Sequence, residues 1–522
     1  MREREWDAVV IGGGAAGLSA AQMLGRARRR TLVIDGGRPR NRFAPQMHGV
    51  LGHDGVAPGD VLARGLEELA RYGVRVEAGE VAGIVDDGLT LRVLRVDGTV
   101  DTARAVIIAS GIRDELPAVD GIEQLWGRGV LHCPYCHGYE VADARLGVLA
   151  TSPQSIHQIE LVRQWTADLT AFTAAIEPLG EEVRVRLHAR GIRIVSTPIV
   201  GLVAEDGVLR AARDAEGIEH DIDALFVAAT PVIDLDFAEP LGLDRADQPG
   251  SPVAVDMLGA TSHPRVWAAG NVAAPYGNVP VAMATGSMAG AGANAALAAE
   301  DAELAVLERA RQRDADWELR YAERDRIWSG RVNPAMADVV TNLPVGTALE
   351  IGCGEGADAV WLAERGWRVS AVDVSETAIR RAAGAARERR LGERLSFFVG
   401  SGAAAAPAGT FDLVTASFLH SWEPDFPRIS LLREAADRVA AGGHLLVISH
   451  AAPPPWSRHG IGDSQQHEHG PRLLSPEEEL GLLTLAPDEW EPVIVGIRPR
   501  EAQGPDGESA LLDDGVLLLR RR

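Results

Sequence analysis

The residues best suited to chemistry are two cysteines, Cys133 and Cys136, in the segment His132-Cys133-Pro134-Tyr135-Cys136-His137. A Cys-x-x-Cys pair can close into a disulfide, and a neighbouring acid or base can set which sulfur is the thiolate. Half of a zinc site is the other chemistry open to such a pair, but the sequence holds no second Cys-x-x-Cys to complete four ligands. The spacing favours thiol–disulfide redox chemistry without a metal. His137 titrates near neutrality and can take a proton from an incoming thiol.

A glycine-rich turn near the N-terminus has the pattern of a dinucleotide site. The apolar run 7–11 predicts a buried strand, the turn after it fits G-x-G-x-x-G, and residues 18–26 have helical composition. Such a turn brings backbone N–H groups and a helix N-terminus to a pyrophosphate, and an acid after the next strand can take ribose hydroxyls. The turn and its acid comprise Gly12, Gly14, Ala15, Gly17 and Asp35.

A second glycine turn follows the predicted strand 348–351, and a strand over 367–372 again ends in an acid. Its spacing is E-x-G-x-G-x-G rather than G-x-G-x-x-G, so we expect a different nucleotide-bearing cofactor. The residues are Glu350, Gly352, Gly354, Gly356 and Asp373.

Composition limits what else the chain can do. A net charge of −22 leaves no basic excess to neutralise phosphates, which argues against a nucleic-acid partner. No apolar run approaches the roughly 18 residues that span a bilayer, and the N-terminus leads straight into a strand rather than a signal peptide. We therefore expect no membrane association and a cytoplasmic enzyme.

Residues 5–300 resemble the two-dinucleotide-binding flavoprotein disulfide reductases, nearest to low-molecular-weight thioredoxin reductases and small-molecule dithiol oxidases. The glycine turn, Asp35, Ala109-Ser110-Gly111, the cysteine pair and Val266 to Asn271 occur in the family's order. The resemblance implies FAD as cofactor, Cys136 on the flavin side and Cys133 exchanging with substrate. It adds to the FAD residues Asn41, Gly111, Gly270, Asn271 and Val279.

Three departures from the family bear on function. The second domain lacks the leading glycines of its nucleotide turn, with Ala150 to Ser155 in their place, and residues 173–178 carry no positive charge for a 2′-phosphate. These changes argue against productive NAD(P)H binding. His137 stands where thioredoxin reductases have a proton-donating aspartate, and Asn271 replaces an aspartate that holds the ribityl chain, so weaker FAD anchoring is expected there.

Residues 317–522 resemble class I S-adenosylmethionine-dependent methyltransferases, on the second glycine turn, Asp373, and the fourth and fifth strands near 411–416 and 441–447. The acid expected near adenine is absent, and Ser401 stands there. His420 is expected to border the methyl-transfer site. A Pro-rich stretch carries further histidines for which we favour an active-site cover over a metal site: His450, His459, His467 and His469.

We therefore predict an α/β protein with a two-dinucleotide-binding-domain flavoprotein fold followed by a Rossmann-like class I methyltransferase domain. The predicted domains are 1–117 plus 245–300 for FAD, 118–244 for the inserted redox-pair domain, 301–316 for a helical linker and 317–522 for methyl transfer. A Gly- and Ala-rich helix over 281–299 predicts close packing at a homodimer interface.

The predicted function is dual. One half oxidises a small-molecule dithiol, with O2 as acceptor, and the other methylates a small acceptor, with a thiol as the acceptor that the fusion suggests. The alternative is an NAD(P)H-dependent reductase of a thioredoxin-like protein, with a methyltransferase or S-adenosylmethionine-sensing domain attached.

Overall fold

The computed structural model divides the chain into two compact units, residues 1–303 and 304–522. It describes residues 4–421, 426–452, 473–503 and 508–522. Across these residues, no helix combines the length and apolarity that crossing a bilayer requires.

The first sheet of unit 1 has the strand order β3-β2-β1-β6-β5-β4, with β17 pairing β6. β1 pairs in parallel with β2 and β6, and its last four residues are buried because both faces are covered: Ala8 and Val10 pack against α1, and Val9 and Ile11 join an apolar cluster on the other face. The elements are β1 (Arg4–Ile11), α1 (Ala15–Arg26), β2 (Thr31–Asp35), α2 (Pro58–Arg71), β3 (Arg75–Ala78), β4 (Val81–Asp86), β5 (Leu91–Arg95), β6 (Val100–Ile108), β17 (Val266–Ala268) and η3 (Gly270–Val272).

The second sheet, β11-β10-β9-β15-β8, is parallel and is inserted between β6 and β17. The chain enters and leaves this insertion through the antiparallel pair β7–β16. The elements between β6 and β17 are β7 (Arg113–Glu115), α3 (Ile122–Leu125), β8 (Val130–Leu131), α4 (Pro134–His137), β9 (Leu146–Leu149), α5 (Ser155–Val162), β10 (Leu169–Phe172), η1 (Ala174–Ile176), α6 (Glu181–Ala189), β11 (Arg193–Val195), β12 (Ile199–Glu205), β13 (Val208–Asp214), β14 (Glu219–Asp221), β15 (Ala224–Val227), β16 (Thr230–Val232) and η2 (Asp236–Leu241). Of these, β12, β13 and β14 form a separate antiparallel sheet, and η2 packs against the first sheet.

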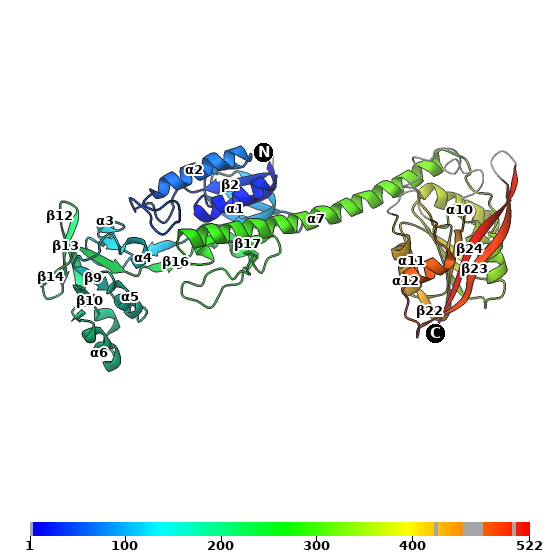
Figure 1. Ribbon diagram of the computed structural model, residues 1–522. Coiled ribbons are helices and arrows are strands. Elements are labelled where there is room, and N and C mark those ends of the chain that lie inside the picture. The colour runs from blue at the N-terminus through cyan, green and yellow to red at the C-terminus, as the bar shows by residue number, and fades with distance from the viewer. Residues whose placement is uncertain (1–3, 422–425, 453–472, 504–507) are drawn as a thin grey trace. The chain divides into compact units, whose positions relative to one another are not determined.

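Helix α7 (Val279–Ala322) belongs to both units, since the division between them falls within it. The separate helix and linker expected from the sequence form one helix of 44 residues, because no Gly or Pro interrupts residues 293–322. Figure 1 shows α7 beside α1, and a Cβ on Gly286 or Gly290 would lie 2.1 or 2.5 Å from a carbonyl oxygen of α1. These two glycines therefore serve packing within the chain, and the homodimer stays a prediction.

Unit 2 is built on one sheet with the order β20-β19-β18-β21-β22-β24-β23, in which only β24 and β23 are antiparallel to their neighbours. Helices cover both faces of this sheet (Figure 1), so its central strands are largely apolar, with Glu350 and Thr415 as buried polar exceptions. The elements are α8 (Pro334–Val340), β18 (Thr347–Ile351), α9 (Ala357–Glu364), β19 (Arg368–Asp373), α10 (Glu376–Glu388), β20 (Leu395–Val399), η4 (Ala403–Ala405), β21 (Phe411–Ser417), α11 (Arg428–Asp437), β22 (Val439–His450), α12 (Pro476–Leu483), β23 (Trp490–Gln503) and β24 (Ser509–Arg521).

Candidate active sites

The first glycine turn joins β1 to α1, and the steric surroundings of its glycines differ. Gly12 has a φ of +107°, and a Cβ there would lie 2.3 Å from the carbonyl oxygen of Ala109. A Cβ on Gly17 would lie 1.9 Å from the carbonyl oxygen of Gly12, so only glycine lets α1 pack on the turn. A Cβ on Gly14 would meet no described atom within 4 Å. No side chain among the described residues caps α1, which begins at Ala15, so the turn presents backbone N–H groups and fits a pyrophosphate.

The acid after β2 is hydrogen-bonded to this turn. Asp35 Oδ1 accepts from the backbone N–H of Gly13 at 3.1 Å and of Gly37 at 3.0 Å. These bonds hold Asp35 at the carboxyl edge of the sheet, where an adenosine ribose lies in folds of this kind. Gly111, just after β6, has a φ of +73° and open space at its Cβ position within the described structure. Asn41 is half-buried in the loop between β2 and α2.

Asn271 braces the segment that leads into α7. Its amide nitrogen donates to the carbonyl oxygens of Ala274 at 3.1 Å, Pro275 at 3.3 Å and Gly277 at 2.8 Å. A carboxylate has no hydrogen to donate and would face three carbonyl oxygens. Asn271 therefore stabilises this segment through its amide group, a role that comparison with the family's aspartate did not indicate.

Two further predicted FAD residues flank this braced segment. Gly270 has a φ of +71°, and its N–H donates to Thr285 Oγ1 of α7 at 3.0 Å. Val279 is the first residue of α7. Arg40, which no motif singled out, reaches the same segment by donating to the Pro275 carbonyl oxygen at 3.2 Å while its guanidinium pairs with Asp114.

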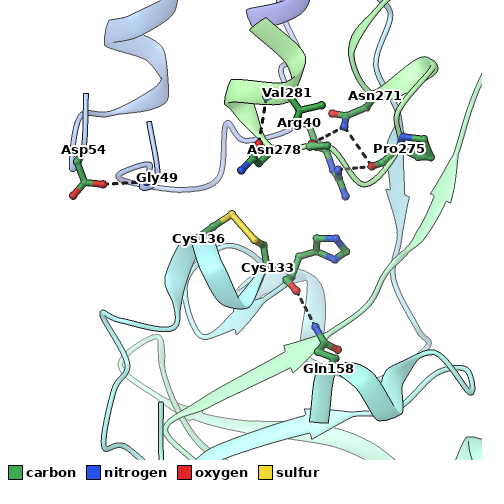
Figure 2. The surroundings of a disulfide bond; sticks show 12 residues. Arg40, Gly49, Asp54, Cys133, Cys136, Gln158, Asn271, Pro275, Asn278 and Val281 are labelled. Carbon is green, nitrogen blue, oxygen red and sulfur yellow. Dashed lines mark hydrogen bonds between the residues drawn. A yellow bond between two sulfur atoms is a disulfide. The ribbon is translucent and has the colours of Figure 1, made fainter. Parts of the chain in front are cut away.

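Cys133 and Cys136 form a disulfide at the start of α4, with their Cα atoms 5.2 Å apart. Pro134 occupies the first turn of this short helix, where its missing N–H is harmless. In Figure 2 the disulfide faces the part of the first sheet's loops that carries Gly49 and Asn278. The inserted sheet thus presents the redox pair towards the predicted flavin site.

Burial keeps both histidines beside the pair neutral. Burial lowers the pKa of His137, the Glu140 carboxylate opposes this, and His48 adds to it. Burial also lowers the pKa of His132, whose Nδ1 is enclosed without a hydrogen-bond partner among the described residues. Gln158 of α5 donates to the His132 carbonyl oxygen at 2.9 Å and so ties the segment down. A neutral imidazole at His137 is in the form that accepts a proton from a thiol.

A second dinucleotide would bind at the turn between β9 and α5. The backbone N–H groups of this turn already donate to a side chain of the same segment. Ser155 Oγ accepts from the backbone N–H of Thr151 at 3.1 Å and of Ser152 at 3.4 Å. Ser155 is 1% exposed, so no pyrophosphate reaches these donors without displacing it. The residues present do not fit a dinucleotide at this turn.

Hydrogen bonds within the chain also occupy the region after β10. The Glu177 carboxylate accepts hydrogen bonds from Thr173 Oγ1, the Leu179 N–H, Arg184 and Ser196 Oγ, at 2.8 to 3.1 Å. The Leu179 backbone hydrogen bond is the largest of the effects that lower the pKa of Glu177, so this group is ionised at neutral pH. Glu177 also holds Arg184 in an ion pair, so this guanidinium is engaged within the fold rather than available to the 2′-phosphate of NADPH.

The second glycine turn joins β18 to α9. Gly352, Gly354 and Gly356 have φ values of +70°, +52° and +79°, which L side chains rarely adopt. A Cβ on Gly356 would lie 2.7 Å from the Ala382 Cβ of α10. The turn is therefore closely packed, and a side chain at any of these three positions would strain it.

Two acids border this turn. Asp373 Oδ2 accepts from the Gly354 N–H at 2.8 Å, and its Oδ1 accepts from the Ser375 N–H at 3.0 Å. Glu350 is 3% exposed, and burial, assisted by Asp358 and Asp373, raises its pKa well above the ordinary value. Its Oε2 has no hydrogen-bond partner among the described residues. An enclosed carboxyl oxygen awaiting a donor fits the amine-bearing end of S-adenosylmethionine.

The end of α7 covers the same turn, which the sequence did not indicate. A Cβ on Gly354 would lie 2.9 Å from Tyr321 Oη, and Trp328 Nε1 donates to that hydroxyl at 2.9 Å. Glu355 accepts from the Trp328 N–H at 3.1 Å, and Glu318 accepts from the residues that begin α10. Within unit 2, the last turns of α7 are therefore part of the candidate cofactor site.

His420 follows β21 and packs against His450 at the end of β22, with ring centroids 5.4 Å apart and planes at 16°. Burial and the charge of Arg428 lower the pKa of His420 to about 3, so it is neutral. Its neighbour Leu419 contacts the glycine turn, since a Cβ on Gly352 would lie 2.9 Å from Leu419 Cδ1. Leu419 thus lies against the glycine turn, and the place of the neighbouring His420 at the methyl-transfer site stays a prediction.

The remaining predicted residues are more peripheral. Ser401 is exposed just beyond β20. His459, His467 and His469 lie outside the described residues. Among the residues that the structure does describe, no group of three or more His, Cys, Asp or Glu side chains is arranged to hold a metal ion.

Comparison with known proteins identifies a family for the N-terminal part of the chain and a domain type for the C-terminal part. Residues 6–286 match the profile of the pyridine nucleotide-disulphide oxidoreductases, and residues 348–443 match that of a methyltransferase domain. The chain belongs to the pyridine nucleotide-disulphide oxidoreductase family and carries a methyltransferase domain in addition. The predicted fold class is confirmed, and the protein is a thioredoxin reductase-like flavoprotein oxidoreductase fused to a methyltransferase.

Individual relatives align with somewhat more than half of this chain. Thioredoxin reductase tcpT of Claviceps purpurea is 34% identical over 306 residues, which are 56% of this chain and 95% of that protein. Thioredoxin reductase sirT of Leptosphaeria maculans is 32% identical, over 55% of this chain and 93% of its own length. The crystal structure of HlmI is 40% identical with a TM-score of 0.57 and covers 59% of this chain and 96% of its own. An oxidoreductase from Agrobacterium tumefaciens is 36% identical with a TM-score of 0.54, over 56% of this chain and 98% of its own.

The family and the domain imply FAD and S-adenosylmethionine, and the two glycine turns fit them. FAD, when bound, would accept an electron pair and pass it on. S-adenosylmethionine, when bound, supplies an electrophilic methyl group.

Proposed function

We propose that the N-terminal half oxidises a small-molecule dithiol to its disulfide through Cys133 and Cys136, with O2 as the final electron acceptor. The observation that carries this proposal is the turn between β9 and α5, whose N–H groups are already taken by Ser155. Glu177 adds a negative charge at the end of the next strand. With no fitting place for a nicotinamide cofactor, electrons enter from a thiol.

The protein's own residues carry the sulfur chemistry. A substrate thiol gives its proton to His137, and the thiolate attacks Cys133 Sγ, so the Cys133–Cys136 bond breaks and its electron pair stays on Cys136. The second substrate thiolate then attacks the sulfur bound to Cys133, which closes the substrate disulfide and releases Cys133 as a thiolate. The substrate has lost two electrons and two protons, and the cysteine pair holds the electrons.

Anaerobic stopped-flow mixing of the full-length holoprotein tests this direction. We expect dithiothreitol to bleach the flavin absorbance rapidly and NADPH at millimolar concentration to leave it unchanged. The Cys133→Ser variant, with the same FAD content, should be inert to dithiothreitol. Rapid bleaching by NADPH would contradict the oxidase proposal.

The second candidate is an NAD(P)H-dependent reductase of a thioredoxin-like protein. It is favoured by the names of tcpT and sirT, both called thioredoxin reductase. Rapid bleaching by NADPH, followed by electron transfer to a thioredoxin, would support it.

For the C-terminal half we propose methyl transfer to a small acceptor, with a thiol as the acceptor. Leu419, the neighbour of His420, lies against the glycine turn and His420 is neutral, so we place His420 on the acceptor side of this site, where its imidazole can orient the acceptor. We assign the cofactor to Glu350, Gly352, Gly354, Gly356, Asp373 and Ser401.

The fusion suggests that both halves act on the same dithiol. The first half would oxidise it to a disulfide, and the second half would methylate its free thiols to thioethers. Labelled S-adenosylmethionine with the full-length protein and matched thiol, alcohol and amine acceptors tests this. We expect label on the thiol. Label only on oxygen or nitrogen acceptors would end the coupling proposal while leaving the redox proposal intact.

We further propose the domain boundaries given above, a homodimer and a cytoplasmic location. Light scattering of the purified full-length protein measures the oligomer directly.

A further inference from the structure

Most backbone donors of the second glycine turn are already used within the chain. The N–H groups of Gly352 and Cys353 donate to one carbonyl oxygen of β19 at 2.8 and 3.0 Å. The Gly354 N–H donates to Asp373 Oδ2 at 2.8 Å, and the Gly356 N–H donates to the Cys353 carbonyl oxygen at 2.9 Å. These four groups therefore do not supply hydrogen bonds to a ligand that lies against the turn.

S-adenosylmethionine needs both acceptors and donors from its site. Its ammonium and its ribose hydroxyls are donors, and the acids Glu350 and Asp373 are acceptors that suit them. Its carboxylate is an acceptor and carries a negative charge, so the two acids cannot bind it. Because the four N–H groups of the turn are engaged, a donor on a neighbouring element is expected for this carboxylate.

Tyr321, in the last turn of α7, has such a donor. A Cβ on Gly354 would lie 2.9 Å from Tyr321 Oη, and Trp328 Nε1 donates to the same oxygen at 2.9 Å. An indole N–H can only donate, so this bond uses a lone pair of the phenol and leaves the phenol's own hydrogen unassigned. Among the described residues, none accepts that hydrogen. Burial raises the pKa of Tyr321, so the hydroxyl keeps its hydrogen at neutral pH.

Ion pairs and hydrogen bonds hold Tyr321 in this position. Arg381 of α10 donates to the Tyr321 carbonyl oxygen at 3.0 Å and to Glu355 Oε1 of the turn at 2.9 Å. The Trp317 ring lies on the other turn of α7, with its centroid 6.1 Å from that of Tyr321. Tyr321 is 3% exposed, and a buried hydroxyl hydrogen without an acceptor is costly. Its place beside Gly354 indicates that a bound ligand supplies the acceptor.

We propose that the Tyr321 hydroxyl donates a hydrogen bond to the carboxylate of S-adenosylmethionine and so selects cofactors that carry this carboxylate. The role rests on the proposed assignment of S-adenosylmethionine to this turn. Glu350 takes the ammonium of the same end, and Trp328 orients the phenol by occupying one of its lone pairs. A cofactor-binding residue is thereby assigned outside residues 348–443, the part that matches the methyltransferase profile.

Calorimetric titration of the full-length protein with three ligands tests this role. Decarboxylated S-adenosylmethionine keeps the ammonium and lacks the carboxylate, and 5′-methylthioadenosine lacks both. We expect Tyr321→Phe to bind S-adenosylmethionine about 10- to 100-fold more weakly, the value of a hydrogen bond to a charged group. The same variant should bind the other two ligands as the wild type does. Glu350→Gln should weaken both ligands that carry the ammonium and leave 5′-methylthioadenosine unaffected.

The comparison between ligands separates this role from a structural one. Tyr321→Phe also deprives Trp328 of its partner, but that loss affects all three ligands alike. The matched control is Tyr72→Phe, which removes a hydroxyl that accepts from Arg26 at 2.7 Å in unit 1 and should leave all three affinities unchanged.

Selective loss of S-adenosylmethionine binding in Tyr321→Phe supports the proposal. Unchanged binding of S-adenosylmethionine, or equal weakening of S-adenosylmethionine and its decarboxylated form, overturns it. If the wild-type protein binds 5′-methylthioadenosine and the decarboxylated form as tightly as S-adenosylmethionine, no carboxylate donor exists and the proposal also fails. If the wild type binds none of the three ligands, the assignment of the cofactor to this turn fails together with the role of Tyr321.

Discussion

Replacing Asn271 by aspartate is expected to change FAD affinity in opposite directions, depending on whether family resemblance or the structure is used. Family resemblance treats aspartate as the better anchor for the ribityl chain of FAD, so Asn271→Asp should tighten cofactor binding. The structure predicts the opposite, because the Asn271 amide donates to the carbonyl oxygens of Ala274, Pro275 and Gly277. A carboxylate would repel all three.

The magnitude follows from these contacts. An amide has two hydrogens, so two of the three contacts are satisfied at any moment, each with a net value of about 1 kcal/mol. Losing both costs about 2 kcal/mol, and repulsion between the carboxylate and the carbonyl oxygens adds to it. If FAD binds only to the braced segment, 2 kcal/mol corresponds to roughly 30-fold weaker binding.

FAD affinity is measured by titrating apoprotein with FAD, and the unfolding temperature of the apoprotein is recorded alongside. Asn278→Asp is the matched control, because Asn278 Oδ1 accepts from the Val281 N–H and a carboxylate accepts equally well at a helix N-terminus. We expect this control to keep its unfolding temperature. Should Asn271→Asp bind FAD as tightly as the wild type with unchanged unfolding temperature, the bracing argument is refuted.

Three further predictions concern other parts of the chain. Gly17→Ala places a Cβ 1.9 Å from the Gly12 carbonyl oxygen, costs about 1–3 kcal/mol of stability and should yield protein without FAD, measured by the ratio of 450 to 280 nm absorbance. Gly354→Ala strains a φ of +52° and displaces Tyr321, so calorimetry should show S-adenosylmethionine binding at least about 10-fold weaker while the FAD content is unchanged. Two arginines lower the pKa of Glu77 to about 2, so its stabilising contribution is complete above pH 4.5 and is lost as pH falls towards 2. Glu77→Gln should therefore lower the unfolding temperature far more at pH 7 than at pH 2.5.

Local sequence patterns were sufficient to predict much of both candidate sites. A strand, a glycine turn and an acid after the next strand are encoded within about 25 residues, because they depend on backbone conformation and on burial of neighbouring apolar residues. Gly12, Gly17 and Asp35 could be named for this reason, as could Gly354 and Asp373 in the second half. The order of these motifs along the chain was enough to predict the fold class.

Only the tertiary structure decided what the polar side chains bind. Ser155 bonding its own turn, Asn271 bracing its loop and Tyr321 covering Gly354 are contacts that no spacing rule contains. The reason is physical: a hydrogen bond depends on which donor and acceptor the fold brings within about 3 Å, often from segments far apart in sequence. His48 and Glu140, 92 positions apart, meet only because the inserted sheet places the redox helix against a loop of the first sheet.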